Sequence, residues 1–152
     1  MQEFIYTCGI ASSGKSTWCQ NYLKTYSFLN YVYLNPDSLR AVIGKDESDQ
    51  TINGKVFSNL FIFTDYILKI GGSILYDATS YSKKNRKTFI EIARKYKVEV
   101  VAVNFNIPLD KCVERNNNRD RKVPFDVIKR QFNNLEYPEL GEECDKIIWV
   151  NN

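Results

Sequence analysis

The chain has 152 residues, 43% of them hydrophobic and 26% charged, which is the composition of an ordinary soluble globular protein. It contains no histidine, so a Ser-His-Asp triad, a Cys-His dyad and an HExxH zinc site are all excluded. The net charge of +3 points to no class of partner, and the length predicts one domain spanning residues 1–152.

Apolar runs of strand length alternate with amphipathic helical patterns along the whole chain. A strand is expected at residues 4–8, a helix at 16–26, a strand at 31–34 and a helix that begins with Asn35 as N-cap and Pro36 at its first position. In chain order there follow a helix at 52–70, a strand at 73–77, a helix at 84–96, a strand at 98–105, helices at 109–118 and 125–135, and a strand at 146–150. This alternation predicts an α/β protein with a five-stranded parallel sheet and helices on both faces. Together with the loop at residues 9–16 and the basic segment near residue 120, both described below, it resembles the P-loop NTPase fold with a basic helical lid.

The first strand is followed by a phosphate-binding loop. Residues 9–16 read GIASSGKS and match the pattern GxxxxGK[ST], in the strand-to-helix context that this motif requires. Backbone N–H groups of such a loop converge on phosphate oxygens, and the helix amino terminus adds a partial positive charge. Lys15 would reach the β- and γ-phosphates and Ser16 would join the Mg²⁺ shell. The sequence predicts ATP or another nucleoside triphosphate with Mg²⁺, bound by Gly9, Ala11, Ser12, Ser13, Gly14, Lys15, Ser16 and Thr17.

Two carboxylates follow later strands, at the sheet edge where ligands of such folds bind. Asp37 is the candidate general base for an acceptor hydroxyl, although an Asp in the first turn of a helix also complements the helix dipole. Arg40 lies three residues later on the same helical face and could pair with Asp37 or hold an acceptor phosphate. Asp77 ends an apolar run, where it could hold a Mg²⁺-bound water, orient the acceptor, or simply close the strand.

A lid is predicted at about residues 115–125. Three asparagines, several basic residues and Pro124 are typical of a helix end followed by a loop, and arginines on a mobile loop can stabilise a transferring phosphoryl group. Arg119 and Arg121 are alternative catalytic arginines here, and Arg115 is grouped with the nucleotide-binding residues. A plain solvated loop would show the same composition.

Charge is unevenly distributed. Residues 83–97 carry seven basic residues and one acid, whereas residues 136–145 carry five acids and no base. The basic segment could extend a track for an anion, with Tyr81 stacking on a base, or it could be a solvated helix face.

The four cysteines, Cys8, Cys19, Cys112 and Cys144, form no CxxC pair, so the simplest interpretation is a reduced, cytoplasmic protein. Residues 56–70 are the longest apolar stretch, but polar residues interrupt it and it is too short for a membrane span. No membrane partner is therefore expected.

Four patches resemble the 5′-hydroxyl polynucleotide kinases of phage and bacterial end repair. They are residues 9–18, residues 35–40 (similar to an Asn-x-Asp-x-x-Arg motif), residues 77–80 with 85–86, and residues 104–108 with 115–128. The resemblance implies a kinase that transfers the γ-phosphate of ATP to a 5′-hydroxyl end of RNA or DNA. On the donor side it implies that Lys15 and Arg119 stabilise the transferring phosphate and that Ser16 binds Mg²⁺.

On the acceptor side, the resemblance implies that Asp37 is the general base and that Arg40 contacts the phosphate 3′ of the acceptor nucleoside. It further implies that Asp77 supports the acceptor site and that Val123 lies against the terminal nucleobase. Two alternatives stay open. One is a P-loop kinase for a small-molecule hydroxyl, zeta-toxin-like or gluconate-kinase-like, and the other is a non-catalytic NTP-binding module.

Overall fold

The computed structural model describes residues 1–151 and contains a five-stranded parallel sheet in the order β2-β3-β1-β4-β5. The strands are β1 (Glu3–Cys8), β2 (Val32–Leu34), β3 (Ile74–Tyr76), β4 (Glu99–Phe105) and β5 (Lys146–Val150). The α-helices are α1 (Lys15–Thr25), α2 (Pro36–Ile43), α3 (Asn53–Lys69), α4 (Lys83–Lys95), α5 (Leu109–Asn117) and α6 (Phe125–Asn133). The predicted fold class is confirmed.

Strand β1 lies at the centre of the sheet, paired with β3 on one side and with β4 on the other. Residues 4–8 of this strand are all buried, as expected for a parallel strand that is covered on both faces. Two apolar clusters, one on each face, form the core. On one face Phe4 and Tyr6 pack against α3 and α4, and on the other face Ile5 packs with residues of α1, α5 and α6.

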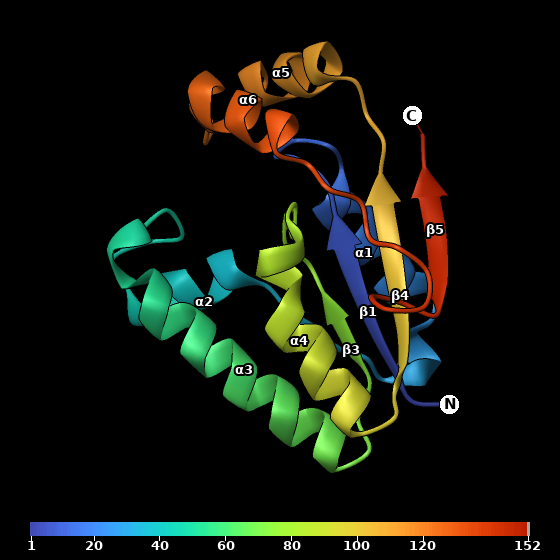
Figure 1. Cartoon of the computed structure of the whole chain (residues 1–152). Helices are drawn as coiled ribbons and strands as arrows, with labels where there is room; N and C mark the ends of the chain where they lie inside the picture. Colours follow the sequence, from blue (N-terminus) through green and yellow to red (C-terminus); the bar gives the residue numbers. More distant parts are fainter. Residues whose placement is uncertain (152) are drawn as a thin grey trace.

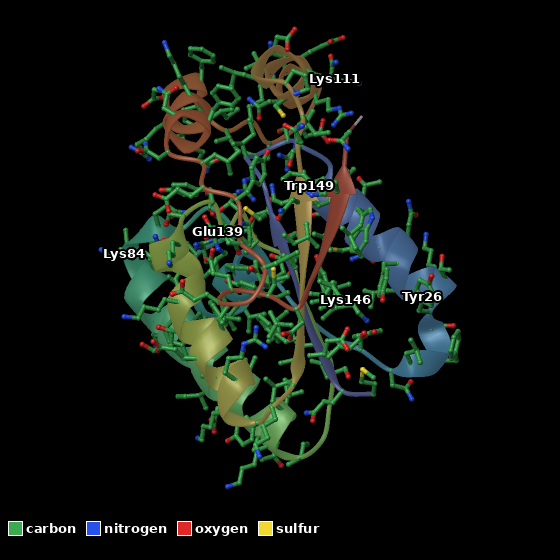
Figure 2. The ribbon with its side chains drawn as sticks, turned by 45° about the vertical axis from the view of Figure 1, so that its right-hand side comes forward. Tyr26, Lys84, Lys111, Glu139, Lys146 and Trp149 are labelled. Atoms are coloured by element: carbon green, nitrogen blue, oxygen red, sulfur yellow. The ribbon has the colours of Figure 1, made fainter. Side chains whose placement is uncertain are left out.

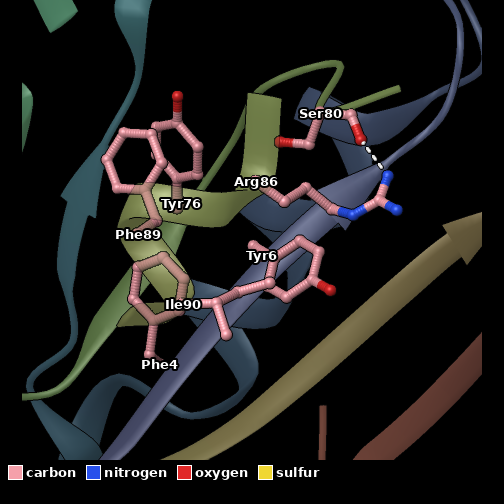
Figure 3. A pocket seen from close by; sticks show the side chains of 7 residues that line it. All are labelled: Phe4, Tyr6, Tyr76, Ser80, Arg86, Phe89 and Ile90. Atoms are coloured by element: carbon pink, nitrogen blue, oxygen red, sulfur yellow. Dashed lines mark hydrogen bonds between the residues drawn. The ribbon is translucent and has the colours of Figure 1, made fainter. Parts of the chain in front are cut away.

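Figure 1 shows α3 and α4 together on one side of the sheet, with α1 on the other. Aromatic rings fill the space beneath α4, where Tyr76 and Phe89 have ring centroids 4.4 Å apart and Phe4 stacks on both. Figure 3 shows this group with the Arg86 side chain extending past it towards Ser80. The packed face fixes α4, and hence the loop between β3 and α4, against the sheet.

Helices α5 and α6 lie beyond the carboxyl ends of β1 and β4 (Figure 1). They form a hairpin, joined by residues 118–124, which contains most of the predicted lid. This places the lid at the edge of the sheet where the phosphate-binding loop and Asp37 also lie.

Most predicted boundaries agree with the structure to within one or two residues. The helix expected at 52–70 agrees with α3 to within one residue at each end, and a short 3₁₀ turn (Gln50–Ile52) that was not predicted precedes it. Another 3₁₀ turn, Ser27–Leu29, follows α1 and was not predicted. Both lie at helix ends, where such turns are common. The N-cap prediction holds, since Asn35 Oδ1 accepts a hydrogen bond from Ser38 N at 3.0 Å.

The acidic segment 136–145, here called the acidic strap, packs on the basic helix α4. Figure 2 shows Glu139 of this strap beside the helix that carries Lys84. Three ion pairs join the two segments: Lys83 to Glu142, Arg86 to Glu143 and Arg94 to Asp145. The strap therefore pairs three of the seven basic residues of segment 83–97, and an anion track along this segment stays a prediction.

Candidate nucleotide and acceptor site

The phosphate-binding loop needs glycine at two positions for different reasons. A Cβ on Gly9 would lie 2.8 Å from Cβ of Phe105, so only glycine lets the loop pass the end of β4. Gly14 is the N-cap of α1 with φ of 100°, a left-handed conformation that other residues rarely adopt. Ser12, also left-handed with φ of 62°, completes the curl between them.

Lys15 is buried inside this loop. Its Nζ donates hydrogen bonds to the carbonyl of Ile10 at 2.6 Å and to Ser13 Oγ at 3.4 Å. Burial lowers the pKa of the ammonium to about 8, while the nearby Asp77 carboxylate opposes the shift. The ammonium is poorly solvated, so phosphate oxygens would be better partners for it than the present carbonyl.

The loop fits a nucleoside triphosphate with Mg²⁺. Ser16 and Thr17 are exposed in the first turn of α1, where a hydroxyl is open to a metal that phosphates also hold. Among residues 1–151, no three His, Cys, Asp or Glu side chains gather as a metal site of their own. Ser16 and the nucleotide phosphates would hold Mg²⁺ in such a site, and the ion would neutralise charge on the β- and γ-phosphates.

Asp77 lies just after β3 and is almost completely buried, with 2% of its surface exposed. Its Oδ2 accepts hydrogen bonds from the Tyr33 hydroxyl at 2.6 Å and from Asn35 Nδ2 at 3.1 Å. Asp77 is thereby tied to the end of β2 and to the N-cap of α2. This arrangement suits a group that supports the start of α2, where Asp37 lies.

Asp37 and Arg40 form an ion pair on α2, with Arg40 Nη1 2.5 Å from Asp37 Oδ1. Arg40 is buried and its Nε also donates to Asn53 Oδ1 at 3.0 Å, which fixes the guanidinium between α2 and α3. The Asp37 carboxylate is nearly half exposed. A fixed cation beside an accessible carboxylate can orient an anionic acceptor next to a base.

The lid arginines divide between the two sides of the site. Arg115 Nη1 donates to the Ser13 carbonyl at 3.2 Å, and Arg119 Nη1 donates to Ser12 Oγ at 3.2 Å, so both contact the phosphate-binding loop. Arg121 instead lies 3.5 Å from Asp37 Oδ2 and 3.0 Å from Glu47 Oε1. The two alternatives for the catalytic arginine are therefore in different surroundings, and Arg119 is the one on the nucleotide side.

Val123 is half-buried against the second core cluster, the one that includes α5 and α6. Both polar atoms of Asn116 hold its backbone, with Nδ2 donating to the Val123 carbonyl at 2.8 Å and Oδ1 accepting from Val123 N at 2.9 Å. These bonds fix the carboxyl end of the lid loop to α5. Contact between Val123 and a nucleobase stays a prediction.

The structure adds residues to the site that the motifs did not indicate. Gln131 of α6 accepts a hydrogen bond from Ala11 N at 2.9 Å, although 120 residues separate the two in sequence. Tyr33 and Glu47 reach the site as partners of Asp77 and Arg121. The signal that could have found Tyr33 is its place one residue before the end of β2, because carboxyl ends of parallel strands meet.

No helix within residues 1–151 is both long enough and apolar enough to cross a membrane. All four cysteines are free thiols and buried, which agrees with the expected absence of local disulfides.

Several known proteins are similar to this chain in sequence or in fold. The L-seryl-tRNA(Sec) kinase of Methanococcus maripaludis is 26% identical over 138 residues, which cover 88% of this chain and 52% of that protein. A chain of the Pnkp1/Rnl/Hen1 RNA repair complex superposes with a TM-score of 0.76 at 19% identity, over 88% of this chain and 44% of that one. Kti12 of Chaetomium thermophilum, solved with ADP-AlF3, also has a TM-score of 0.76, at 17% identity, over 97% of this chain and 88% of that one.

The chain spans about half the length of the seryl-tRNA kinase and less than half of the RNA repair protein. The structural likenesses establish the fold of P-loop kinases. A family model described as an AAA domain matches residues 4–138, most of the chain, and includes the phosphate-binding loop, Asp37 and the lid. The protein thus belongs to this AAA domain family and has the P-loop kinase fold.

Proposed function

We propose that the protein is a kinase that transfers the γ-phosphate of ATP to the 5′-hydroxyl end of RNA or DNA. The observation that carries the proposal is the ion pair between Asp37 and Arg40, which lies at the sheet edge that also carries the phosphate-binding loop. A carboxylate to accept a hydroxyl proton and a fixed guanidinium for an adjacent phosphate are what such an acceptor requires. The resemblance of residues 35–40 to the polynucleotide kinase motif supports the same acceptor.

In this proposal each residue has a stated task. Asp37 accepts the proton of the 5′-hydroxyl as its oxygen attacks the γ-phosphorus, and ADP leaves. Lys15 and Arg119 stabilise negative charge on the transferring group, and Arg115 holds the loop around the nucleotide. Arg40 positions the acceptor through its first phosphate, so that the hydroxyl lies against Asp37.

A second candidate is phosphorylation of a hydroxyl carried by an aminoacyl-tRNA. The observation in its favour is the 26% identity to a seryl-tRNA(Sec) kinase over 88% of this chain. Both candidates place the acceptor hydroxyl on a nucleic acid, so both call for anion-binding residues near Asp37. A small-molecule acceptor would instead need few contacts outside a closed pocket.

Transfer of label from γ-labelled ATP and Mg²⁺ distinguishes the candidates. The acceptors are a 5′-hydroxyl RNA oligonucleotide, the matching DNA, and seryl-tRNA, with a panel of small hydroxyl compounds as a fourth arm. We expect label at the 5′ end of an oligonucleotide. Label only on seryl-tRNA or only on a small molecule would replace the proposed acceptor.

Asp37→Asn tests the base in the same assay. Loss of a general base should lower the transfer rate by about 10²–10⁴-fold while ATP binding is unchanged. A decrease of less than tenfold would show that Asp37 serves only as a helix-end charge.

A further inference from the structure

Arg121 joins the lid to two acidic residues on the acceptor side. Its Nη2 lies 3.5 Å from Asp37 Oδ2, and its Nη1 lies 3.0 Å from Glu47 Oε1. Glu47 belongs to the connection between α2 and α3, so Arg121 links the lid loop both to α2 and to this connection. Both neighbouring carboxylates raise the pKa of the guanidinium, against the effect of burial.

Arg40 and Arg121 contact different oxygens of the same carboxylate, and their side chains differ in how firmly they are held. Arg40 contacts Asp37 Oδ1, and its side chain is only 8% exposed and anchored to Asn53. Arg121 contacts Oδ2, is 34% exposed and lies on the loop between α5 and α6. Of the two cations around Asp37, Arg121 is the one that can change partners without disturbing the core.

Glu47 differs from the other acids of its loop. Asp46 accepts hydrogen bonds from Ser48, and Asp49 accepts them from Lys45 and Thr51, so both hold the turn together. Among the described residues, the only ion pair of Glu47 is the one to Arg121. Its side chain is about half exposed and is not needed for the fold of the loop.

We propose that Arg121 is a specificity-determining residue that, with Arg40, contacts the anionic linkage of the acceptor next to its 5′-hydroxyl. When no acceptor is bound, Glu47 forms an ion pair with Arg121 in place of that linkage. The inference rests on the proposed function. An incoming phosphodiester exchanges with Glu47 and leaves Asp37 beside the hydroxyl. The lid thereby closes over the acceptor as well as over the nucleotide.

The exchange predicts that two substitutions in one ion pair have opposite effects. Arg121→Ala removes a charge-assisted contact, so KM for a 5′-hydroxyl oligonucleotide should rise about tenfold or more. Glu47→Gln removes a competitor from an exposed pair, so the same KM should fall by roughly two- to fivefold. KM for ATP should change little in either variant, because neither residue contacts the phosphate-binding loop. If the pair served only to stabilise the closed fold, both substitutions would act in the same direction.

The experiment measures kcat and KM for wild type, both single variants, the double variant and Lys122→Ala. Lys122 is the next lid residue and forms no ion pair in the described chain, so it controls for general loss of positive charge. A second acceptor carries a neutral methylphosphonate at the first linkage. On this acceptor the effect of Arg121→Ala should disappear, and in the double variant Glu47→Gln should have no further effect.

Failure of the inference and failure of the proposed function give different results. Label transfer by wild type with KM changes of equal sign, or an undiminished Arg121→Ala effect on the neutral linkage, overturns the role of Arg121 and leaves the kinase proposal intact. If wild type labels no oligonucleotide, the proposed function fails and the inference fails with it. Thermal melting of each variant shows whether any loss of activity reflects unfolding.

Discussion

The charged group of Lys15 is buried, which is energetically unfavourable for an ammonium. The residue Lys15 is only 8% exposed, so its ammonium has lost much of its hydration, and the hydrogen bonds to Ile10 and Ser13 replace only part of it. Burial therefore lowers the pKa of this lysine from 10.5 to about 8. Burial thus destabilises the folded protein at the residue that, in the proposed function, binds the nucleotide phosphates, and strongly shifted pKa values are common at functional sites.

Replacing Lys15 with Met should therefore separate stability from activity. At pH 7 we expect Lys15→Met to be more stable than wild type, by up to about 3 kcal/mol, and to transfer no phosphate. Between pH 8 and 10.5 the unfolded chain holds a proton on Lys15 that the folded chain has lost. The free energy of unfolding of the wild type therefore rises with pH over this range, and the difference in stability between Lys15→Met and wild type becomes smaller. Urea unfolding at pH 7 and 9.5 measures both differences. Lys24→Met, an exposed site on the same helix, is the control, and an equal gain there would contradict the assignment.

Nucleotide binding should depend on pH through the same group. Phosphate oxygens favour the ammonium form of Lys15, so above pH 8 binding requires uptake of a proton and Kd should rise by up to about tenfold per pH unit. Calorimetry in buffers of different ionisation enthalpy, at pH 7 and pH 9, measures the uptake directly. Equal Kd values at the two pH values would show that Lys15 is already charged in the free protein.

At this scale the sequence indicates local pairs better than distant ones. The ion pair between Asp37 and Arg40 could be predicted from the sequence because the two residues lie three positions apart on one helix. Gln131 and Glu47 could not be found in this way, because their partners are brought near only by the sheet and the lid.

Among the elements, the acidic strap holds α4 in place and pairs with several of its basic side chains. The Arg86 and Glu143 side chains are 1% and 6% exposed, so their ion pair at 2.8 Å is buried. Arg86 also donates to the carbonyls of Ser80 and Glu136, at 2.8 and 2.7 Å. One guanidinium thus joins α4, the loop after β3 and the chain that leaves the lid.

Breaking this ion pair should be far more costly than breaking its exposed neighbour. Glu143→Gln leaves a buried guanidinium without its counter-charge, and we expect a loss of about 3–5 kcal/mol, which lowers Tm by roughly 10 °C. Glu142→Gln breaks the exposed pair with Lys83 and should cost less than about 1 kcal/mol. Thermal unfolding of both variants makes the comparison. Similar melting temperatures would mean that the strap is held mainly by its backbone.

The position of the acidic strap could not be predicted from the sequence. Opposite charges in residues 83–97 and 136–145 were visible in the sequence, but charge patterns do not say whether two segments meet or face solvent. Strands and helices were predictable because each has its own apolar period, fixed by local geometry. The strap has no such period, so its position is fixed only by tertiary contacts.

For the molecule as a whole, these contacts limit how much of a nucleic acid the protein could hold. Three cations of α4 are paired with the strap, and among the described residues Arg40 and Arg121 are the cations that pair with Asp37. In the proposed function, the basic charge of the chain therefore serves two purposes, folding at α4 and anion binding at the lid.

Salt dependence should report this small footprint. Because Arg40 and Arg121 are proposed to share one linkage, one neutralised phosphate of a single strand gives a slope of log K against log salt of about −0.7. Lys84 has no ion pair among the described residues, so Lys84→Ala should leave the slope unchanged, whereas Arg121→Ala should make it shallower. Fluorescence anisotropy of a labelled 5′-hydroxyl oligonucleotide measures these slopes. A much steeper wild-type slope would place further nucleic-acid contacts outside the lid and α2.

The four buried thiols have a practical consequence for observing the lid. Burial raises the thiol pKa of all four, to about 11 for Cys8 and Cys144, so in the folded protein they are both shielded and protonated. A maleimide dye should therefore react first with a cysteine introduced at an exposed position such as Lys122. Paired with a second introduced site on α3, that dye would report lid opening by energy transfer in an otherwise native chain.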